Sequence, residues 1–407
     1  MRIARFVLTL TTLLAGLFGV PRAMTDAEGG PQLVRQGTGV QHPLFVHDAL
    51  PLDVTGGDAQ TQAVQLSAFW PDLMRSYLGL TGNGEGETIA IVTAFHHPAL
   101  LADLVEFSSL FDLPLVCGEP FVDPNDCINV NVVVDPDTPV DEAWALETAL
   151  DVQWAHAIAP RADLIVVEAP SDDLRSMMLA VRTASRSGAS VVSGSWGEAE
   201  DPAQRKYDGY CVAPVVCVFA TGNDGQPAAY PAISKRSIAV GGTSIRLDND
   251  GNVISEDGWS GSGGGLSEWR TRPAYQRDVS AYEWRGSPDV SYNADPQRPY
   301  VVYDSVGYQG ASGLFALGGT SAAAPQWAAI IAVANQLRVA EGKPRLSTLG
   351  LKTGRALYSL AGSPALYDVT TGSNGDCDVC NAEPGYDFVT GLGSPRKGID
   401  VALAATP

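Results

Sequence analysis

The sequence predicts an α/β fold in which a mostly parallel central sheet is covered by helices on both faces. Two observations predict it. Strands made of consecutive apolar residues alternate along the chain with amphipathic helices, which is typical of strands buried on both faces. No internal repeat or obvious linker interrupts this alternation, so one domain is favoured over two. Sites in such sheets form where loops converge at the carboxyl ends of the strands.

The elements follow from local patterns in chain order. Phe69, Leu73, Tyr77 and Leu80 recur at helical spacing, and a Gly-rich turn then leads into the apolar strand 88–93. Further helices are expected over 98–110, 140–157, 173–187 and 322–337, and further strands over 164–168, 189–193, 215–220 and 237–241.

Composition narrows the function classes. Of the 407 residues 45% are apolar, as in a soluble globular protein, and 26 Lys and Arg against 46 Asp and Glu give a formal net charge of −20. Such a field repels polyanions, so neither nucleic acid nor an anionic membrane is expected as a partner.

The N-terminus resembles a secretory signal peptide. Arg2 and Arg5 precede an apolar run, and small or turn residues follow, so residues 1–23 are expected to be a signal peptide, with an uncleaved anchor as the alternative. Residues 24–51 lack periodicity and are interpreted as a leader or extended arm. The protein is therefore expected to be secreted, extracellular or periplasmic.

Six cysteines occur as three pairs close in sequence, Cys117/Cys127, Cys211/Cys217 and Cys377/Cys380. An even count suits an oxidising compartment and predicts three local disulfides. Cys377 and Cys380 could alternatively form a redox or zinc half-motif, although no second pair of ligands lies at metal-binding spacing.

Two carboxyl groups point to a catalytic site. Glu147 and Asp151 are four residues apart in an expected helix, so they share one face and could enter one cleft. The alternative is a solvated acidic face. Far downstream, Ser321 follows two glycines and Thr320 and precedes an Ala-rich helix, which places a hydroxyl at a positive helix end. Ser321 could instead be only a helix N-cap.

Several ordered motifs resemble the sedolisins, the serine-carboxyl peptidases that share a subtilisin-like fold. Gly318–Pro325 resembles their Ser-Gly-Thr-Ser-x-x-x-Pro segment, and Glu147 with Leu150–Pro160 resembles their catalytic helix. Tyr230-Pro-Ala-Ile, Ile238–Thr243, Gly263–Trp269 and Pro288–Ser291 follow in the family's order, and the resemblance covers roughly residues 66 to 398. It implies one peptidase domain over 52–407 with three layers.

The resemblance also implies roles for residues. Ser321 is the nucleophile, Glu147 the general base and Asp151 the residue that orients it; a carboxylate can serve as base at low pH or with a raised pKa. The substrate-binding strand is formed by Ser193, Gly194, Ser195, Trp196 and Gly197.

Two departures from the family pattern are informative. Where sedolisins carry an Asp in the oxyanion hole, this chain has Asn223, whose amide donates at every pH; a register shift that makes Asp224 the donor is the rival alignment. Thr93 replaces a supporting acidic residue at the end of the first strand, and His96 or His97 could contribute there. His156 is expected to point away from the carboxylates.

Near the C-terminus, two Gly- and Asp-rich segments resemble the calcium site of the family. Asp368 and Asp387 are expected to supply side-chain oxygens, and Val369, Glu383 and Gly385 backbone oxygens, to one structural Ca²⁺. The alternative is a surface turn without an ion.

The sequence therefore predicts a secreted, monomeric serine-carboxyl endopeptidase that hydrolyses protein or peptide substrates through an acyl-enzyme. The family's large prosegment is not expected within this chain. Two alternatives stay open: a catalytically weak relative that binds peptides, suggested by Thr93 and Asn223, and an exopeptidase that releases tripeptides.

Overall fold

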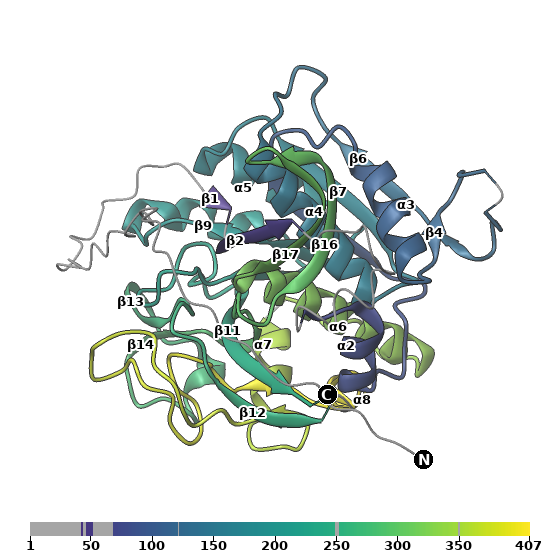
Figure 1. Cartoon of the computed structure of the whole chain (residues 1–407). Helices are drawn as coiled ribbons and strands as arrows, with labels where there is room; N and C mark the ends of the chain where they lie inside the picture. The colour runs from purple at the N-terminus through teal and green to yellow at the C-terminus, as the bar shows by residue number, and fades with distance from the viewer. Residues whose placement is uncertain (1–41, 44–45, 52–67, 121, 249–251, 349–350) are drawn as a thin grey trace, which may run out of the picture. The chain divides into compact units, whose positions relative to one another are not determined.

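An eight-stranded sheet runs through the centre of the computed structural model (Figure 1). The structure describes residues 42–43, 46–51, 68–120, 122–248, 252–348 and 351–407. The strand order is β12-β11-β10-β8-β3-β7-β6, with β15 paired to β11, and every pair is parallel except β11 with β12. The strands are β3 (Thr88–Ala94), β6 (Val130–Val133), β7 (Asp163–Ala169), β8 (Val191–Gly194), β10 (Val216–Ala220), β11 (Ser237–Leu247), β12 (Val253–Gly258) and β15 (Val290–Asn293). The predicted α/β class is confirmed.

Alternate residues of the strands enter two different cores, because side chains of a strand point to opposite faces. Ile89 and Ile91 of β3 join the core that contains α4 (Glu142–Ile158) and α6 (Thr320–Ala340). Ala90 and Val92 join the second core, with α5 (Leu174–Ala184). The remaining helices are α2 (Pro71–Leu78), α3 (Leu100–Leu110), α7 (Lys352–Tyr358), α8 (Ile399–Ala405) and the 3₁₀ helices η1 (Pro202–Tyr210) and η2 (Ala274–Gln276).

The predicted boundaries are close to the observed ones, and caps explain several of them. The side chain of Asp141 accepts the N–H of Trp144 and starts α4, and Asp173 accepts the N–H of Ser176 and starts α5. Helix α5 ends earlier than predicted, at Ala184, and Gly188 with φ 97° follows in a conformation that favours glycine.

An antiparallel hairpin was not predicted. Strands β16 (Tyr300–Tyr308) and β17 (Ala311–Gly318) pair with each other. Strand β16 packs on α4, and β17 leads directly into α6. Smaller pairs are β4 (Leu115–Val116) with β5 (Cys127–Ile128), β13 (Gly265–Thr271) with β14 (Trp284–Ser287), and β18 (Leu366–Tyr367) with β19 (Ser394–Pro395).

The arm expected over 24–51 contains two short strands. Strand β1 (His42–Pro43) pairs antiparallel with β9 (Trp196–Gly197), and β2 (Val46–Pro51) pairs antiparallel with β17. Figure 1 draws both in purple beside these partners. The expected signal peptide, residues 1–23, lies outside the described residues. Within the described ranges no helix is long and apolar enough to cross a membrane.

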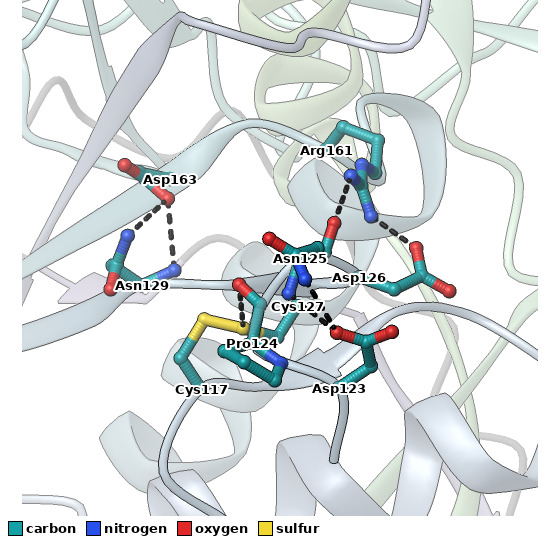
Figure 2. Close-up of a disulfide and its surroundings, with 9 residues drawn as sticks. All are labelled: Cys117, Asp123, Pro124, Asn125, Asp126, Cys127, Asn129, Arg161 and Asp163. Carbon is teal, nitrogen blue, oxygen red and sulfur yellow. Dashed lines mark hydrogen bonds and ion pairs between the residues drawn. A yellow bond between two sulfur atoms is a disulfide. The ribbon is translucent and has the colours of Figure 1, made fainter.

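All three predicted disulfides are present, Cys117–Cys127, Cys211–Cys217 and Cys377–Cys380. Figure 2 shows the first, which closes a loop beside the start of β7. Arg161 pairs with Asp126 of this loop and donates to the carbonyl of Asn125 at 2.9 Å, so the loop is tied to the chain that leaves α4. All six cysteines are paired, so none is free to bind zinc in this structure.

Candidate active site

The two carboxyl groups lie inside the protein. Glu147 and Asp151 are one turn apart on α4, and neither residue has exposed surface. From Trp144 to Ile158 every residue of this helix is buried, so the alternative of a solvated acidic face is wrong. Burial raises the pKa of Asp151 well above its ordinary value, and a hydrogen bond from Ser195 opposes that rise.

Ser321 is the second residue of α6 and is fully buried. Gly319 precedes the helix with φ 106°, a conformation open to glycine, and allows the sharp change from β17 to α6. Pro325 lies farther inside the helix than the sequence suggested. Because proline has no N–H, the carbonyl of Ser321, four residues earlier, loses its helical hydrogen bond.

Ser195 connects helices α4 and α6. Its hydroxyl donates to Asp151 Oδ1 at 2.6 Å and lies 3.4 Å from the carbonyl oxygen of Ser321. Ser195 itself is buried between β8 and β9. Helices α4 and α6 also pack against each other, and Ser195 contacts Asp151 of the first and Ser321 of the second.

The predicted oxyanion donor is held against the start of α6. Asn223 Oδ1 accepts the backbone N–H of Thr320 at 2.8 Å and its hydroxyl at 2.9 Å. Since the amide oxygen takes both donors, the amide nitrogen is the atom with donor capacity on the other side of the group. Asp224, the rival donor, is exposed. The structure thus places Asn223 against Thr320, the residue before Ser321.

The strand that was expected to bind substrate has small or buried side chains, so its backbone is the part that can pair with an extended chain. A Cβ on Gly194 would lie 2.7 Å from the ring of Phe219, so only glycine fits there. Trp196 is buried in the second core, and its indole N–H donates to the carbonyl of Val92 at 2.8 Å. The edge formed by Trp196 and Gly197 pairs with the extended residues His42 and Pro43, in the register His42 with Gly197 and Pro43 with Trp196.

His96, His97 and His156 contact residues other than Glu147, Asp151 and Ser321. His96 Nδ1 is 2.7 Å from Glu168 Oε2, and His97 lies close to Asp103 and Asp304. His156 is buried, its Nε2 is 2.9 Å from the carbonyl of Pro114, and burial lowers its pKa to about 4. Thr93 is buried at the end of β3, and no hydrogen bond satisfies its hydroxyl within the described part of the chain.

The C-terminal aspartates lie in adjoining loops. Asp368 accepts the N–H of Gly385 at 2.8 Å, and Asp387 accepts the N–H of Glu383 at 3.3 Å. Asp387 also accepts the N–H groups of Val389 and Thr390, both at 2.8 Å. Burial nevertheless raises the pKa of Asp387 to about 6. Val369 is buried directly after Asp368.

Two contacts of the site were not predicted. Thr320 was quoted only as part of a motif, although it anchors Asn223 through two hydrogen bonds. Ser195 was assigned to substrate binding, although its hydroxyl bonds Asp151. Thr320 and Ser195 lie in the sequence next to the predicted site residues Ser321 and Trp196, which could have indicated a role. Their partners are distant in sequence, so only the fold brings them into contact.

Several known proteins are similar to this chain in sequence. A model described as the subtilase family matches residues 143–352. Kumamolisin from Bacillus sp. (strain MN-32) is 31% identical over 404 residues, which covers 86% of this chain and 66% of kumamolisin. Tripeptidyl-peptidase 1 from Dictyostelium discoideum is 26% identical over 367 residues, with 80% and 57% covered. The chain therefore spans less than two thirds of the length of these relatives.

Among solved structures, that of Pseudomonas sedolisin, described as a serine-carboxyl proteinase complexed with two molecules of pseudo-iodotyrostatin, superposes with a TM-score of 0.68 at 22% identity. The match covers 82% of this chain and 96% of the sedolisin chain. At this identity the likeness establishes the fold.

Proposed function

The chain belongs to the sedolisin group of the subtilase family, and from this membership we propose that it is a serine-carboxyl endopeptidase. Ser321 is the nucleophile, Glu147 the general base, Asp151 the residue that orients Glu147, and Asn223 the oxyanion donor. The substrates are proteins or peptides in extended conformation.

The reaction follows the chemistry of acyl transfer. Ser321 Oγ attacks the carbonyl carbon of the substrate while its proton passes to Glu147, and the carbonyl oxygen becomes an oxyanion. When the C–N bond breaks, Glu147 returns this proton to the leaving amine, and an ester on Ser321 remains. Water then attacks the ester, gives its proton to Glu147 and releases the acid, after which Ser321 regains a proton.

One observation carries this proposal: a buried carboxyl group with a raised pKa is hydrogen-bonded to a serine that also lies beside the nucleophile's own backbone. A carboxylate is a weak base when its pKa is near 4. Burial of the pair on α4 raises the proton affinity of Asp151, and a proton shared between the carboxyl groups makes the pair a better acceptor.

Charge that develops on the substrate oxygen meets two stabilising groups. The N-terminus of α6 carries a partial positive charge, and Ser321 lies in its first turn. The Asn223 amide is fixed in orientation by Thr320, so its nitrogen is positioned before the substrate arrives. Preorganised donors of this kind contribute about 3 to 4 kcal/mol to transition-state stabilisation.

Substrate recognition is proposed to occur by strand addition along Ser193, Gly194, Ser195, Trp196 and Gly197. The pairing of β1 with β9 supports this assignment, because this edge already accepts two residues of extended chain in antiparallel register. Main-chain hydrogen bonds give affinity in this mode, and side-chain pockets give specificity.

The test is hydrolysis of an unfolded protein between about pH 3 and about pH 8, with the product ends mapped. We expect turnover by the wild type and none above background by Ser321→Ala. Ser312→Ala, on the exposed part of β17, is the matched control and retains activity. Equal activity of Ser321→Ala and wild type would refute the assignment of the nucleophile.

The tripeptidyl-peptidases among the relatives favour a second candidate, an exopeptidase that removes tripeptides from free N-termini. The same experiment separates the two. Internal cuts indicate the endopeptidase, whereas products that are only tripeptides indicate the exopeptidase. A folded chain that binds peptides without hydrolysis corresponds to the weak relative that Thr93 and Asn223 suggested.

We further propose one structural Ca²⁺ held by Asp368 and Asp387, with backbone oxygens of Val369, Glu383 and Gly385. The residues present fit a hard cation, because two carboxyl groups lie in adjoining loops and burial penalises the charge of Asp387. Among the described residues neither aspartate forms an ion pair with Lys, Arg or His. The ion supplies that counter-charge and joins the loops.

Secretion and a monomeric state complete the proposal. The basic residues and apolar run at the N-terminus support export, and three disulfides suit an oxidising compartment. The domain boundary at residue 52 remains part of the same proposal.

A further inference from the structure

Three side chains that the proposed reaction does not use meet at a buried point outside the catalytic pair. His97 comes from the loop after β3, Asp103 from α3, and Asp304 from β16. Their exposed fractions are 2%, 1% and 0%. One donor atom of each lies within 4.8 Å of the others.

The distances match metal coordination. His97 Nε2 lies 3.1 Å from Asp304 Oδ1 and 3.5 Å from Asp103 Oδ2. Zinc bonds to nitrogen and oxygen are about 2.0 to 2.1 Å long in a tetrahedral site, so neighbouring ligand atoms are separated by about 3.3 Å. Both measured separations fall close to this edge length.

The two carboxyl groups are oriented by backbone donors. Asp103 Oδ2 accepts the N–H of Ser305 at 2.9 Å, and Asp304 Oδ2 accepts the N–H of Gly307 at 2.9 Å. By contrast, three buried atoms make no hydrogen bond within the described residues. They are the two ring nitrogens of His97 and Oδ1 of Asp304. Donor atoms fixed in place without hydrogen bonds are what a cation requires.

The charges of the cluster favour a cation. With both carboxyl groups ionised, two aspartates face one imidazole. A divalent ion would neutralise both carboxylates at once, at a position where desolvation is costly.

We propose that His97, Asp103 and Asp304 form a binding site for a divalent transition metal of the zinc class. Imidazole nitrogen selects zinc-like ions over calcium, which prefers oxygen ligands. A cavity of about 590 Å³ includes His97 in its wall. The metal would join α3 to β16, and the hairpin of β16 and β17 leads to Ser321, so its role is structural support near the active site.

The test uses the full chain, stripped of metal and then kept in excess Ca²⁺ so that the C-terminal site stays filled. Calorimetric titration with Zn²⁺ is expected to give one site in the wild type. His97→Gln should lower the affinity for Zn²⁺ by more than about 100-fold. Loss of a residue that only supports a metal ligand lowers the affinity by about 10- to 100-fold. The matched control is His96→Gln, on the same loop, which should bind Zn²⁺ like the wild type.

A second measurement does not depend on variants that fold poorly. Co²⁺ bound by the wild type is expected to give the visible absorption of a tetrahedral ion, and Asp304→Asn should weaken or shift that band. Absence of both a Zn²⁺ isotherm and this Co²⁺ band in the wild type would overturn the proposal. So would Zn²⁺ binding that His97→Gln leaves unchanged in a folded variant.

Discussion

Asn223 sets the alkaline behaviour expected of the site. Its amide oxygen is held by Thr320, so an Asp in its place would direct one oxygen to Thr320 and could donate only with a proton on the other. A carboxylic acid donor is present below its pKa and lost above it. We therefore expect kcat/KM of Asn223→Asp to fall about 100- to 1000-fold on the alkaline side, relative to the wild type.

The measurement is a pair of pH–rate profiles, with Asp224→Asn as control for the neighbouring exposed residue. Identical alkaline limbs for wild type and Asn223→Asp would contradict the assignment. A limb that moves in Asp224→Asn would instead support the rival alignment.

His156 is expected to limit stability in acid. Burial lowers its pKa to about 4, whereas an unfolded histidine titrates near 6.5. Between these values the unfolded chain binds a proton that the folded chain does not, so stability is full above about pH 6.5 and is lost as pH falls. The loss amounts to at most about 3 kcal/mol of the free energy of unfolding.

Denaturant unfolding of wild type and His156→Gln at about pH 4.5 and about pH 7 measures this loss. The variant should lose less stability on acidification, and His96→Gln, whose side chain is about a third exposed, should behave like the wild type. An equal pH dependence in His156→Gln would show that other groups govern acid unfolding.

Helix α6 contains a proline four residues after Ser321. Pro325 leaves the carbonyl of Ser321 without its helical donor, and the hydroxyl of Ser195 lies 3.4 Å from that oxygen. Pro325→Ala restores a backbone N–H that competes for it. The free energy of unfolding should rise by about 1 kcal/mol, the value of one hydrogen bond, while kcat falls.

Thermal unfolding measures the predicted gain in stability of Pro325→Ala, and single-turnover kinetics measure the predicted fall in its rate. Ala328→Gly, deeper in the same helix, is the control for helix stability, since it should destabilise by about 1 kcal/mol without the loss of kcat. A Pro325→Ala variant that gains both stability and rate would argue against a role for the freed carbonyl.

At the scale of elements, the sequence was most informative where burial is complete. The strands 88–93 and 215–220 are continuously apolar because both faces are covered, and they were predicted within a residue or two. The hairpin 300–318 was missed, although apolar runs flank Gln309 and Gly310, which both have positive φ at the turn. Residues 300–302 and 314–318 are continuously buried, so the alternation of period two that indicates a strand is missing from both halves of the hairpin.

The candidate site also contains contacts that the sequence could predict and contacts that it could not. Glu147 and Asp151 could be paired because helical spacing is a local property. The bond from Ser195 to Asp151 spans 44 residues, and the approach of His97 to Asp304 spans more than 200, so no local pattern predicts either. Such contacts depend on strand order, which periodicity alone does not determine.

For the whole molecule, calcium is expected to contribute to stability. The loops that carry Asp368 and Asp387 pack beside β18 and β19 near the C-terminus, so loss of the ion releases a buried carboxylate without a counter-charge. A calcium chelator should lower Tm by several degrees, as expected for the loss of about 2 to 3 kcal/mol of binding linkage.

Differential scanning calorimetry with and without chelator measures the shift. Asp387→Asn should have a low Tm that no longer responds to chelator, whereas Asp376→Asn, exposed in the same region, should respond like the wild type. The absence of any shift in the wild type would count against calcium.

The strand pair β1 and β9 has a kinetic consequence for the molecule as a whole. With β9 as the substrate edge proposed above, the tethered β1 segment is present there at an effective concentration of the order of millimolar, however dilute the protein is. A free substrate with a micromolar dissociation constant would therefore compete at an apparent affinity weakened by orders of magnitude. Binding of β1 to β9 of the same chain does not depend on protein concentration, so dilution of the enzyme does not relieve it. Only removal or release of the β1 segment does.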